Sequence, residues 1–427
     1  MSALLSRRAA VTVFLAFAFA YFLSALVRAI TATLAPTLAQ EFSLRAADLG
    51  LLAGGYFLGF AATQLPLGAW LDRHGPRKVS LAFLGVAIVG SLVFSLADGF
   101  GGLLLGRLLC GAGVSACLMA PLTGYRRWLE PVAQMRANAW MLMTGSLGMV
   151  ASTLPVQWAL PVVGWRPLFW ALGGLFALAM LLIVWVVPRW QQDTPGPSAA
   201  RPATGTGVQA ATPAVPAPGY GEVWRHPYFR RLMPLGFFVY GGMVAVQTLW
   251  AGPWMQRVAG YSALEAATGL FWVNVSMLCT FWAWGMVNPV LMRRGWNANR
   301  LMRAGLPLSL LVLGGIIAAG PQAGGAAWAL FCVSCTFVSL AQPAVALAFP
   351  SALAGRALSA FNLVIFAGVF VVQWGIGLLV DGLRALGWET VASFQGAMAV
   401  FLLCNVGSYL WFVLQGRSDN AAETLRP

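Results

Sequence analysis

Long apolar stretches recur along the whole chain and constrain its fold more than any other feature. We count twelve such spans, which cover residues 11–36, 47–71, 79–97, 100–125, 137–160, 167–188, 232–254, 265–291, 302–320, 325–349, 357–380 and 391–414. A helix of about twenty residues crosses the roughly 30 Å hydrocarbon core of a bilayer, where backbone polar groups have no water to bond. The sequence therefore predicts an all-α integral membrane protein with twelve transmembrane helices.

The composition indicates that lipid, rather than water, is the solvent. Hydrophobic residues make up 59% of the chain and charged residues 9%, with a mean hydropathy of +0.77. The formal net charge of +14 could indicate a nucleic-acid partner, but the basic residues are sorted by side. Twenty lie outside the spans on one side, and four lie on the other: Arg45, Arg166, Arg257 and Arg384. The positive-inside rule then places both termini in the cytoplasm. We expect a multi-pass protein of the inner (cytoplasmic) membrane that binds no nucleic acid.

A break in composition divides the spans into six and six. Residues 191–221 are rich in Pro, Ala, Gly and Thr, which predicts a disordered linker. Residues 222–231 mix aromatic and basic side chains, which predicts a segment on the membrane surface. The predicted division is 1–190 for an N-terminal six-helix bundle, 191–231 for the linker with its interfacial segment, 232–416 for a C-terminal six-helix bundle and 417–427 for a cytoplasmic tail.

The charged turn between the second and third spans carries the most specific motif. Residues 64–78 read Gln-Leu-Pro-Leu-Gly-Ala-Trp-Leu-Asp-Arg-His-Gly-Pro-Arg-Lys. The motif positions are Gly68, Asp72, Arg73, Gly75 and Arg77. They resemble the loop between the second and third helices of major facilitator superfamily transporters. The resemblance covers essentially the whole chain. It implies a secondary transporter whose two bundles rock around a central site, and no enzyme activity, catalytic residue, metal site or cofactor.

Asp72 is predicted to close one side of the molecule. Its carboxylate stands at the end of the second span, where it can accept hydrogen bonds from the N-terminal amides of a facing helix. The run at 355–362 leads into the eleventh span and is the predicted partner. Gly68 and Gly75 would supply the close approach and the tight turn. The alternative is a solvated loop charge.

Arg107 stands in the fourth span within Gly-Arg-Leu-Leu-Cys-Gly-Ala-Gly. This run is similar to a second motif of the superfamily, in which the arginine is linked to conformational or proton coupling. A central arginine costs about 2.5–3.5 kcal/mol on insertion scales, so it should face the interior of the bundle. The alternative is a packing arginine that bonds neighbouring carbonyl groups.

Arg28 stands in the first span with no carboxylate within one helical turn. The run Arg-Ala-Ile-Thr-Ala-Thr-Leu-Ala-Pro resembles the first helix of organic-anion transporters of the anion:cation symporter and sialin-like branch, in which the arginine lies in the central cavity. Val27 departs from that branch, where an acid commonly precedes the arginine. We expect Arg28 to bind an anionic group of a small organic solute, with a purely structural role as the alternative.

The acidic residues lie at span ends, in loops or in tails, and both histidines, His74 and His226, lie in loops. A proton-coupled carrier normally needs a titratable group in its cavity. Protons therefore remain a candidate coupling partner that would act indirectly, and exchange of anions is the alternative. We expect a monomer whose partners are the bilayer and the solute.

Other polar residues within the spans are candidates for the wall of the cavity. They are Tyr56, Gln64, Gln247, Asn274, Asn362 and Gln373. Hydrogen bonds that pack one helix against another are the alternative for each. For Trp254, near the outer end of its span, we expect a place in the aromatic belt at the membrane interface.

Three other functions fit the same architecture. An efflux carrier for amphipathic compounds would use aromatic and methionine-lined walls with little need for Arg28. A copper importer would use soft ligands such as the pair Cys332 and Cys335. A membrane sensor or scaffold would keep the bundles and lose transport, which the intact Asp72, Arg73 and Arg107 disfavour.

Overall fold

The computed structural model describes residues 4–190 and 220–424. This part of the chain consists of helices and their connections, with no strand, as the sequence predicts. Most of the predicted linker, residues 191–219, lies outside the described residues, as do residues 425–427.

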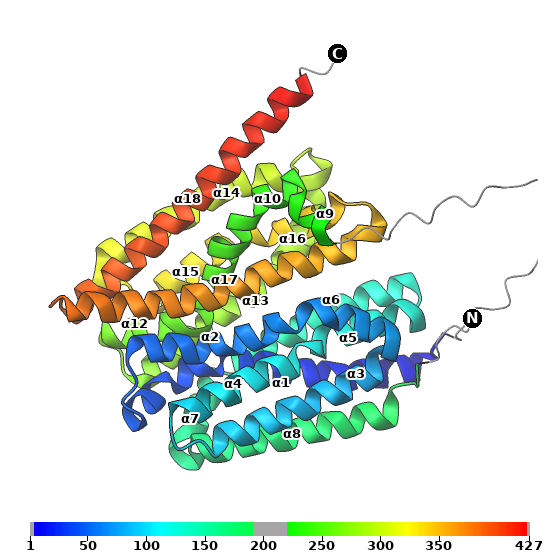
Figure 1. Cartoon of the computed structure of the whole chain (residues 1–427), viewed down its shortest axis with the longest axis horizontal. Helices are drawn as coiled ribbons and strands as arrows, with labels where there is room; N and C mark the ends of the chain where they lie inside the picture. Colours follow the sequence, from blue (N-terminus) through cyan, green and yellow to red (C-terminus); the bar gives the residue numbers. More distant parts are fainter. Residues whose placement is uncertain (1–3, 191–219, 425–427) are drawn as a thin grey trace, which may run out of the picture.

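The helices form two groups, one on each side of the linker (Figure 1). The first half contains, in chain order, α1 (Arg7–Glu41), α2 (Ala46–Ala62), α3 (Gln64–Ser95), α4 (Phe100–Val114), α5 (Ala116–Trp128), α6 (Pro131–Ala151), α7 (Leu154–Val163) and α8 (Trp165–Val186). The second half contains α9 (Tyr220–Arg225), α10 (Pro227–Pro234), η1 (Leu235–Tyr240), α11 (Gly241–Ala245), η2 (Val246–Trp250), α12 (Ala251–Arg257), α13 (Ala263–Arg293), α14 (Ala298–Ala319), η3 (Gly320–Gln322), α15 (Gly325–Cys335), η4 (Thr336–Leu340), α16 (Ala341–Leu347), α17 (Ser351–Ala385) and α18 (Thr390–Thr424).

Within the described residues, ten helices are long and apolar enough to cross a membrane. An eleventh span results if α6 and α7, which meet at a bend of 44°, are counted together. The second predicted span begins as the shorter helix α2 and continues into the first turns of α3. The total of twelve transmembrane helices, and the side on which the termini lie, stay predictions.

The predicted turn at 64–78 is mostly helical. Helix α3 begins at Gln64 and runs through the charged motif into the third span, with a break at Gly75. Gly75 has φ +77° and ψ 163°, a conformation that favours glycine. A Cβ atom there would lie 2.2 Å from the side chain of Trp190. The reversal between the two spans is therefore concentrated in one residue, which Pro76 follows.

The seventh span begins at Pro227, before the predicted start at 232. One face of the segment at 222–231 is buried, because Val223 and Phe229 are both fully buried in the core of the second half. The place of this segment on the membrane surface stays a prediction. At the other end of this half, α18 continues to Thr424, so the beginning of the predicted tail is helical.

We call the end of the molecule where α1 begins and α8 ends the basic end, and the end where α1 ends and α2 begins the opposite end. In Figure 1 the two halves diverge towards the basic end, next to the N-terminus and the grey linker trace, and they meet towards the opposite end. Helices α2 and α17 pack side by side across the boundary between the halves, and α1 contacts η2 and α12.

Candidate functional site

Arg28 lies in the middle of α1 and is half-buried. The hydroxyl groups of Tyr21 and Tyr56 lie against its guanidinium, and its Cζ lies 5.7 Å from the centre of the Phe60 ring. Its Nε is buried and has no hydrogen-bond partner in the described part of the chain. The partners that are present are neutral, so no described residue compensates the positive charge of Arg28.

Arg107 on α4 lies behind this group and is fully buried. Its Nη1 donates to the carbonyl of Val27 at 2.8 Å, and its Cζ lies 4.9 Å from the centre of the Tyr56 ring. Its Nε and Nη2 have no partner among the described residues. Tyr56 therefore interacts with both arginines, and the hydrogen bond to Val27 ties Arg107 to the backbone next to Arg28.

No carboxylate takes part in the interactions that the described residues make with these two arginines. Two ion pairs among the described residues lie at the opposite end instead, between Arg45 and Asp48 and between Arg166 and Glu41. Removing two positive charges from water without a counter-charge is expensive. The centre of the first half is therefore electrostatically suited to an anion.

Aromatic side chains from both halves cover the space near Arg28. The ring centres of Phe60 on α2 and Phe366 on α17 are 4.5 Å apart, and Phe57 stacks on Phe366 at 6.2 Å. Tyr240 in η1 interacts electrostatically with Arg28. The group around Arg28 thus lies where the two halves meet, and it combines a positive charge with apolar surface.

Three polar candidates of the second half have hydrogen-bond partners within that half. Gln247 donates from Nε2 to Oδ1 of Asn274 at 3.0 Å, and Nδ2 of Asn274 donates to the carbonyl of Leu270. Gln373 donates to the Thr248 hydroxyl at 2.9 Å, while its buried Oε1 has no partner in the described part. Helix packing accounts for the first pair, and Gln373 keeps one acceptor available.

Two further candidates make hydrogen bonds to groups other than Arg28. Gln64 is buried and donates to the carbonyl of Phe60 in the preceding turn at 3.4 Å. Asn362 on α17 accepts from Gln342 on α16 at 2.6 Å. Of the residues predicted to line a cavity, the structure places Tyr56 directly beside Arg28 and gives the others partners of their own.

At the basic end, Asp72 of the motif is not engaged across the two halves in this conformation. Asp72 is exposed, and the described residues offer it no hydrogen bond or ion pair. Nη2 of Arg77 donates to the carbonyl of Val184 within the first half, and Arg73 is exposed but has an interaction partner. No atom lies within 4 Å of the Cβ position of Gly68.

The expectation that Trp254 belongs to an interfacial belt is wrong. Its side chain is fully buried, its Nε1 donates to the carbonyl of Ala323 at 3.1 Å, and its ring packs against Trp328. Trp272, in contrast, is 59% exposed. Position along a span fixes the depth of a residue but not the face on which it lies.

Sequence reasoning missed the contributions of Tyr21, Tyr240 and Phe366 to the group around Arg28. The first lies two helical turns before Arg28 on the same helix, so helical periodicity could have indicated it. The other two lie in the second half, and no signal in a single sequence connects them to Arg28. A separate cavity of about 220 Å³, with Thr33, Gln157 and Trp165 in its wall, had no sequence signal either.

Two groups of helices with a charged centre at their boundary define a polytopic membrane protein of the kind that carries solutes. The sequence matches the model of the Major Facilitator Superfamily over residues 17–373, and the chain belongs to this family of membrane transporters, whose members are not enzymes.

Individual relatives are similar over shorter stretches. The inner membrane transport protein YajR of Escherichia coli is 32% identical over 146 residues, which cover 33% of this chain and 31% of YajR. The multidrug resistance protein MdtL of Shigella flexneri is 26% identical over 165 residues, or 38% of this chain and 42% of MdtL. The matched part thus spans less than half the length of these relatives.

The fold as a whole has a solved counterpart. A bacterial homologue of the human lysosomal transporter Spinster, in an inward-facing and unoccupied conformation, superposes with a TM-score of 0.77. The match covers 96% of this chain and 98% of the homologue at 18% identity, so it establishes the fold and no further property.

Proposed function

We propose that this chain is a secondary transporter that moves a small organic anion across the inner membrane by alternating access. Arg28 binds the anionic group, and Phe60, Phe366 and Tyr240 contact an apolar part of the cargo. The observation that carries this proposal is the half-buried Arg28 guanidinium, whose partners in the described chain are neutral hydroxyl groups and aromatic rings. An anionic cargo supplies the missing charge.

The orientation and the coupling follow from the distribution of charge. The positive-inside rule places the basic end in the cytoplasm, so the halves diverge on the cytoplasmic side. Protons act, if they couple to transport, through groups at the ends of helices, because the interactions of Arg28 and Arg107 include no carboxylate among the described residues. The transporter works as a monomer with its site between its own two halves.

In this proposal Arg107 positions the residues of the site and does not bind the cargo. It donates to the carbonyl of Val27 and lies against the face of Tyr56, so it holds α1 and α2 in position and adds positive potential without touching the cargo. This role combines the two readings of its motif, because a packing arginine at this place also orients the residues that bind the anion.

Flux into proteoliposomes tests the proposal. Candidate cargoes come first from a thermal-shift screen of mono- and dicarboxylates, aromatic acids and vitamins, since ligands that bind the folded state raise its Tm. Arg28→Ala should reduce flux of the stabilising anion on the order of a hundredfold, the effect of leaving one member of a buried charge pair alone. Arg28→Lys should retain part of it.

Arg136→Ala is the matched control, because Arg136 is an exposed arginine of α6 at the basic end. Its flux should equal that of the parent protein. If Arg28→Ala transports and binds the anion as the parent does, the anion site is wrong.

Efflux of amphipathic compounds is the second candidate function. The aromatic surface near Arg28 supports it, as does the similarity to MdtL, a multidrug resistance protein. In this case neutral and cationic amphipathic compounds, rather than anions, should raise the Tm, and Arg28→Ala should leave their flux unchanged.

A further inference from the structure

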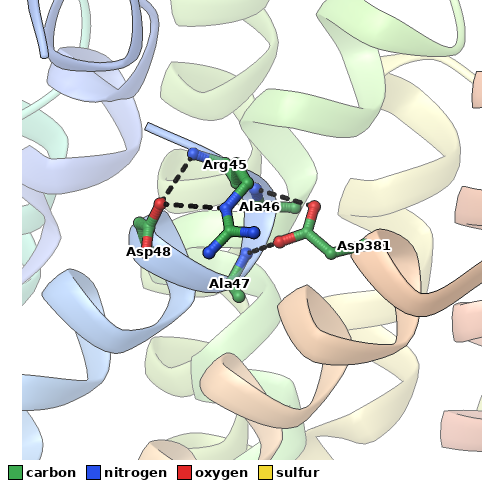
Figure 2. Close-up of polar contacts among 5 residues, drawn as sticks. All are labelled: Arg45, Ala46, Ala47, Asp48 and Asp381. Carbon is green, nitrogen blue, oxygen red and sulfur yellow. Dashed lines mark hydrogen bonds and ion pairs between the residues drawn. The ribbon is translucent and has the colours of Figure 1, made fainter. Parts of the chain in front are cut away.

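Asp381, in the last turns of α17, bonds directly to the first turn of α2 across the boundary between the halves. Its Oδ1 accepts from the backbone N–H of Ala46 at 3.2 Å, and its Oδ2 accepts from the N–H of Ala47 at 2.7 Å (Figure 2). One carboxylate therefore connects residues 335 and 334 positions away in sequence.

The start of α2 is arranged to present these amides. The first N–H groups of a helix have no partner within the helix and carry partial positive charge. Asp48 satisfies the N–H of Arg45, the residue that precedes α2, at 2.9 Å, and this leaves the N–H groups of Ala46 and Ala47 free for Asp381. Asp48 of α2 and Asp381 of the other half thus together accept the hydrogen bonds of the backbone N–H groups at the start of α2.

Glycines bring the two backbones close enough for this contact. A Cβ atom on Gly50 would lie 2.3 Å from the carbonyl oxygen of Gln373, and one on Gly377 would lie 2.4 Å from the carbonyl oxygen of Ala46. Real Cβ atoms do not occur at such distances, so α2 and α17 touch backbone to backbone at the opposite end. We call this backbone contact at Gly50 and Gly377 the seam. It has no room for larger side chains, and the carboxylate of Asp381 lies at its end.

The hydrogen bonds between Asp381 and the start of α2 depend on the conformation of the protein. A carboxylate near the C-terminal end of its own helix is disfavoured by the helix dipole, and the amides of α2 compensate for this. If the halves separate at the opposite end, Asp381 loses both hydrogen bonds at once. The contact therefore stabilises the conformation that is closed at the opposite end and no other.

We propose that Asp381 is a gate residue of the transport cycle, and that it alternates with Asp72 in closing the two ends of the contact between α17 and the second span, which consists of α2 and the first turns of α3. The inference rests on the alternating access proposed above. The two chain segments run in opposite directions, so each carries an aspartate near its own end and faces the start of the other. Asp381 is engaged and Asp72 is idle. Helix α17 starts after Pro350, which provides no side-chain cap, and this helix start is the partner that we propose for Asp72 in the other conformation.

Cysteine labelling tests the gate without any cargo. In protein whose native cysteines are replaced, Ala53→Cys reports on the opposite end, because Ala53 is 1% exposed and lies one helical turn beyond Gly50. Asp381→Asn keeps the size of the side chain and removes its charge. It should raise the labelling rate at this position about tenfold, the effect of losing charge-assisted hydrogen bonds from one state only.

Ala46→Pro removes one of the two donors and leaves the carboxylate in place. Proline is favoured at the first position of a helix, and the extended backbone of Arg45 (φ −82°, ψ 173°) suits a residue before proline. The variant should raise labelling about threefold, as expected for one hydrogen bond rather than two. In the double variant the two effects should not add, because they remove the same contact.

Asp98→Asn is the control, because Asp98 is an exposed carboxylate at the same end; it should leave labelling unchanged. Equal labelling rates for the parent protein, Asp381→Asn and Ala46→Pro, with unchanged Tm, would overturn the gate. So would simple additivity in the double variant. Labelling needs no cargo, so a failure of the Arg28 flux experiment leaves this result standing, and the two proposals fail separately.

Discussion

The contact between α17 and the second span, which consists of α2 and the first turns of α3, has an aspartate and glycines at each of its two ends. Only one of the two aspartates is engaged. At the opposite end Asp381 accepts two hydrogen bonds from α2, and glycines bring the backbones into contact. At the basic end Asp72 is exposed, and Gly68 has empty space where a side chain would lie. Asp72, the aspartate of the sequence motif, is thus unengaged within the described residues, and the engaged contact involves a residue that the motif does not contain.

This difference describes one of the two conformations of the proposed transport cycle. Rigid halves that rock about a central site open one end as they close the other, so the contacts of one end are exchanged for those of the other. The populations depend on differences between these contacts, and cargo shifts them only through different affinity for the two states. Changes confined to one end should therefore have opposite effects from changes confined to the other.

The largest effect is expected from filling the seam at the opposite end. Gly377→Leu places a side chain where even a Cβ meets the carbonyl of Ala46. It should disfavour closure by about 2.8 kcal/mol, within the usual range for overpacking, and so raise labelling of Ala53→Cys about a hundredfold. Gly382→Leu on the same helix is the control, because nothing lies within 4 Å of its Cβ position. Equal labelling of the two variants would contradict the packing argument.

Removing the idle carboxylate should shift the same equilibrium the other way. Asp72→Asn leaves the present state unchanged, because Asp72 makes no contact in it with the described residues, and destabilises only the state closed at the basic end. A change of about 1 kcal/mol, typical of a carboxylate at a helix start, is about a fivefold shift. Labelling of Ala53→Cys should fall, and labelling of Gly355→Cys at the start of α17 should rise. Unaltered labelling at both positions would refute the role of Asp72.

Combining the two aspartate changes should nearly restore the original balance. Each variant removes a stabilising contact from a different state, and the sites lie at opposite ends of a helix pair, so their effects on the populations should add with opposite sign. We expect labelling of Ala53→Cys in Asp72→Asn/Asp381→Asn to lie within about threefold of the parent rate. A double variant that labels like Asp381→Asn alone would show that Asp72 has no part in the exchange.

The smallest effect is expected from an ion pair that stays within one half. Glu41 accepts from Arg166 and from Nε1 of Trp165 at the opposite end, but all three residues belong to the first half. Glu41→Gln should lower stability by less than about 1 kcal/mol, as for exposed ion pairs, and lower the Tm slightly. Labelling of Ala53→Cys should not change, and a change would mean that closure depends on more than contacts between the halves.

The sequence was sufficient for the class of fold and for features that depend on local chemistry. Apolar spans predicted an all-α membrane protein, and the charged motif with Gly75 predicted a reversal, which the structure places at that residue. The inward direction of Arg28 and Arg107 follows from the cost of exposing a charge to lipid. These predictions use only the composition of a segment and its immediate neighbours.

Predictions that depend on which faces meet were less successful. Trp254 was assigned to the interface because of its depth, yet it packs in the core. Contacts between the halves, such as Asp381 with Ala46, join residues hundreds of positions apart, and no periodicity in one chain connects them.

The two π-helical segments of the seventh span, η1 and η2, have a consequence for its evolution. A π turn holds one residue more than an α turn, so it takes up an extra residue and keeps the helix beyond it in phase. Phase matters here, because Trp250 and Trp254 donate to the carbonyl groups of Gln373 and Ala323, and a rotation by about 100°, the turn per residue of an α-helix, would withdraw both donors. The π turns therefore allow this span to change in length by one residue while these hydrogen bonds are kept.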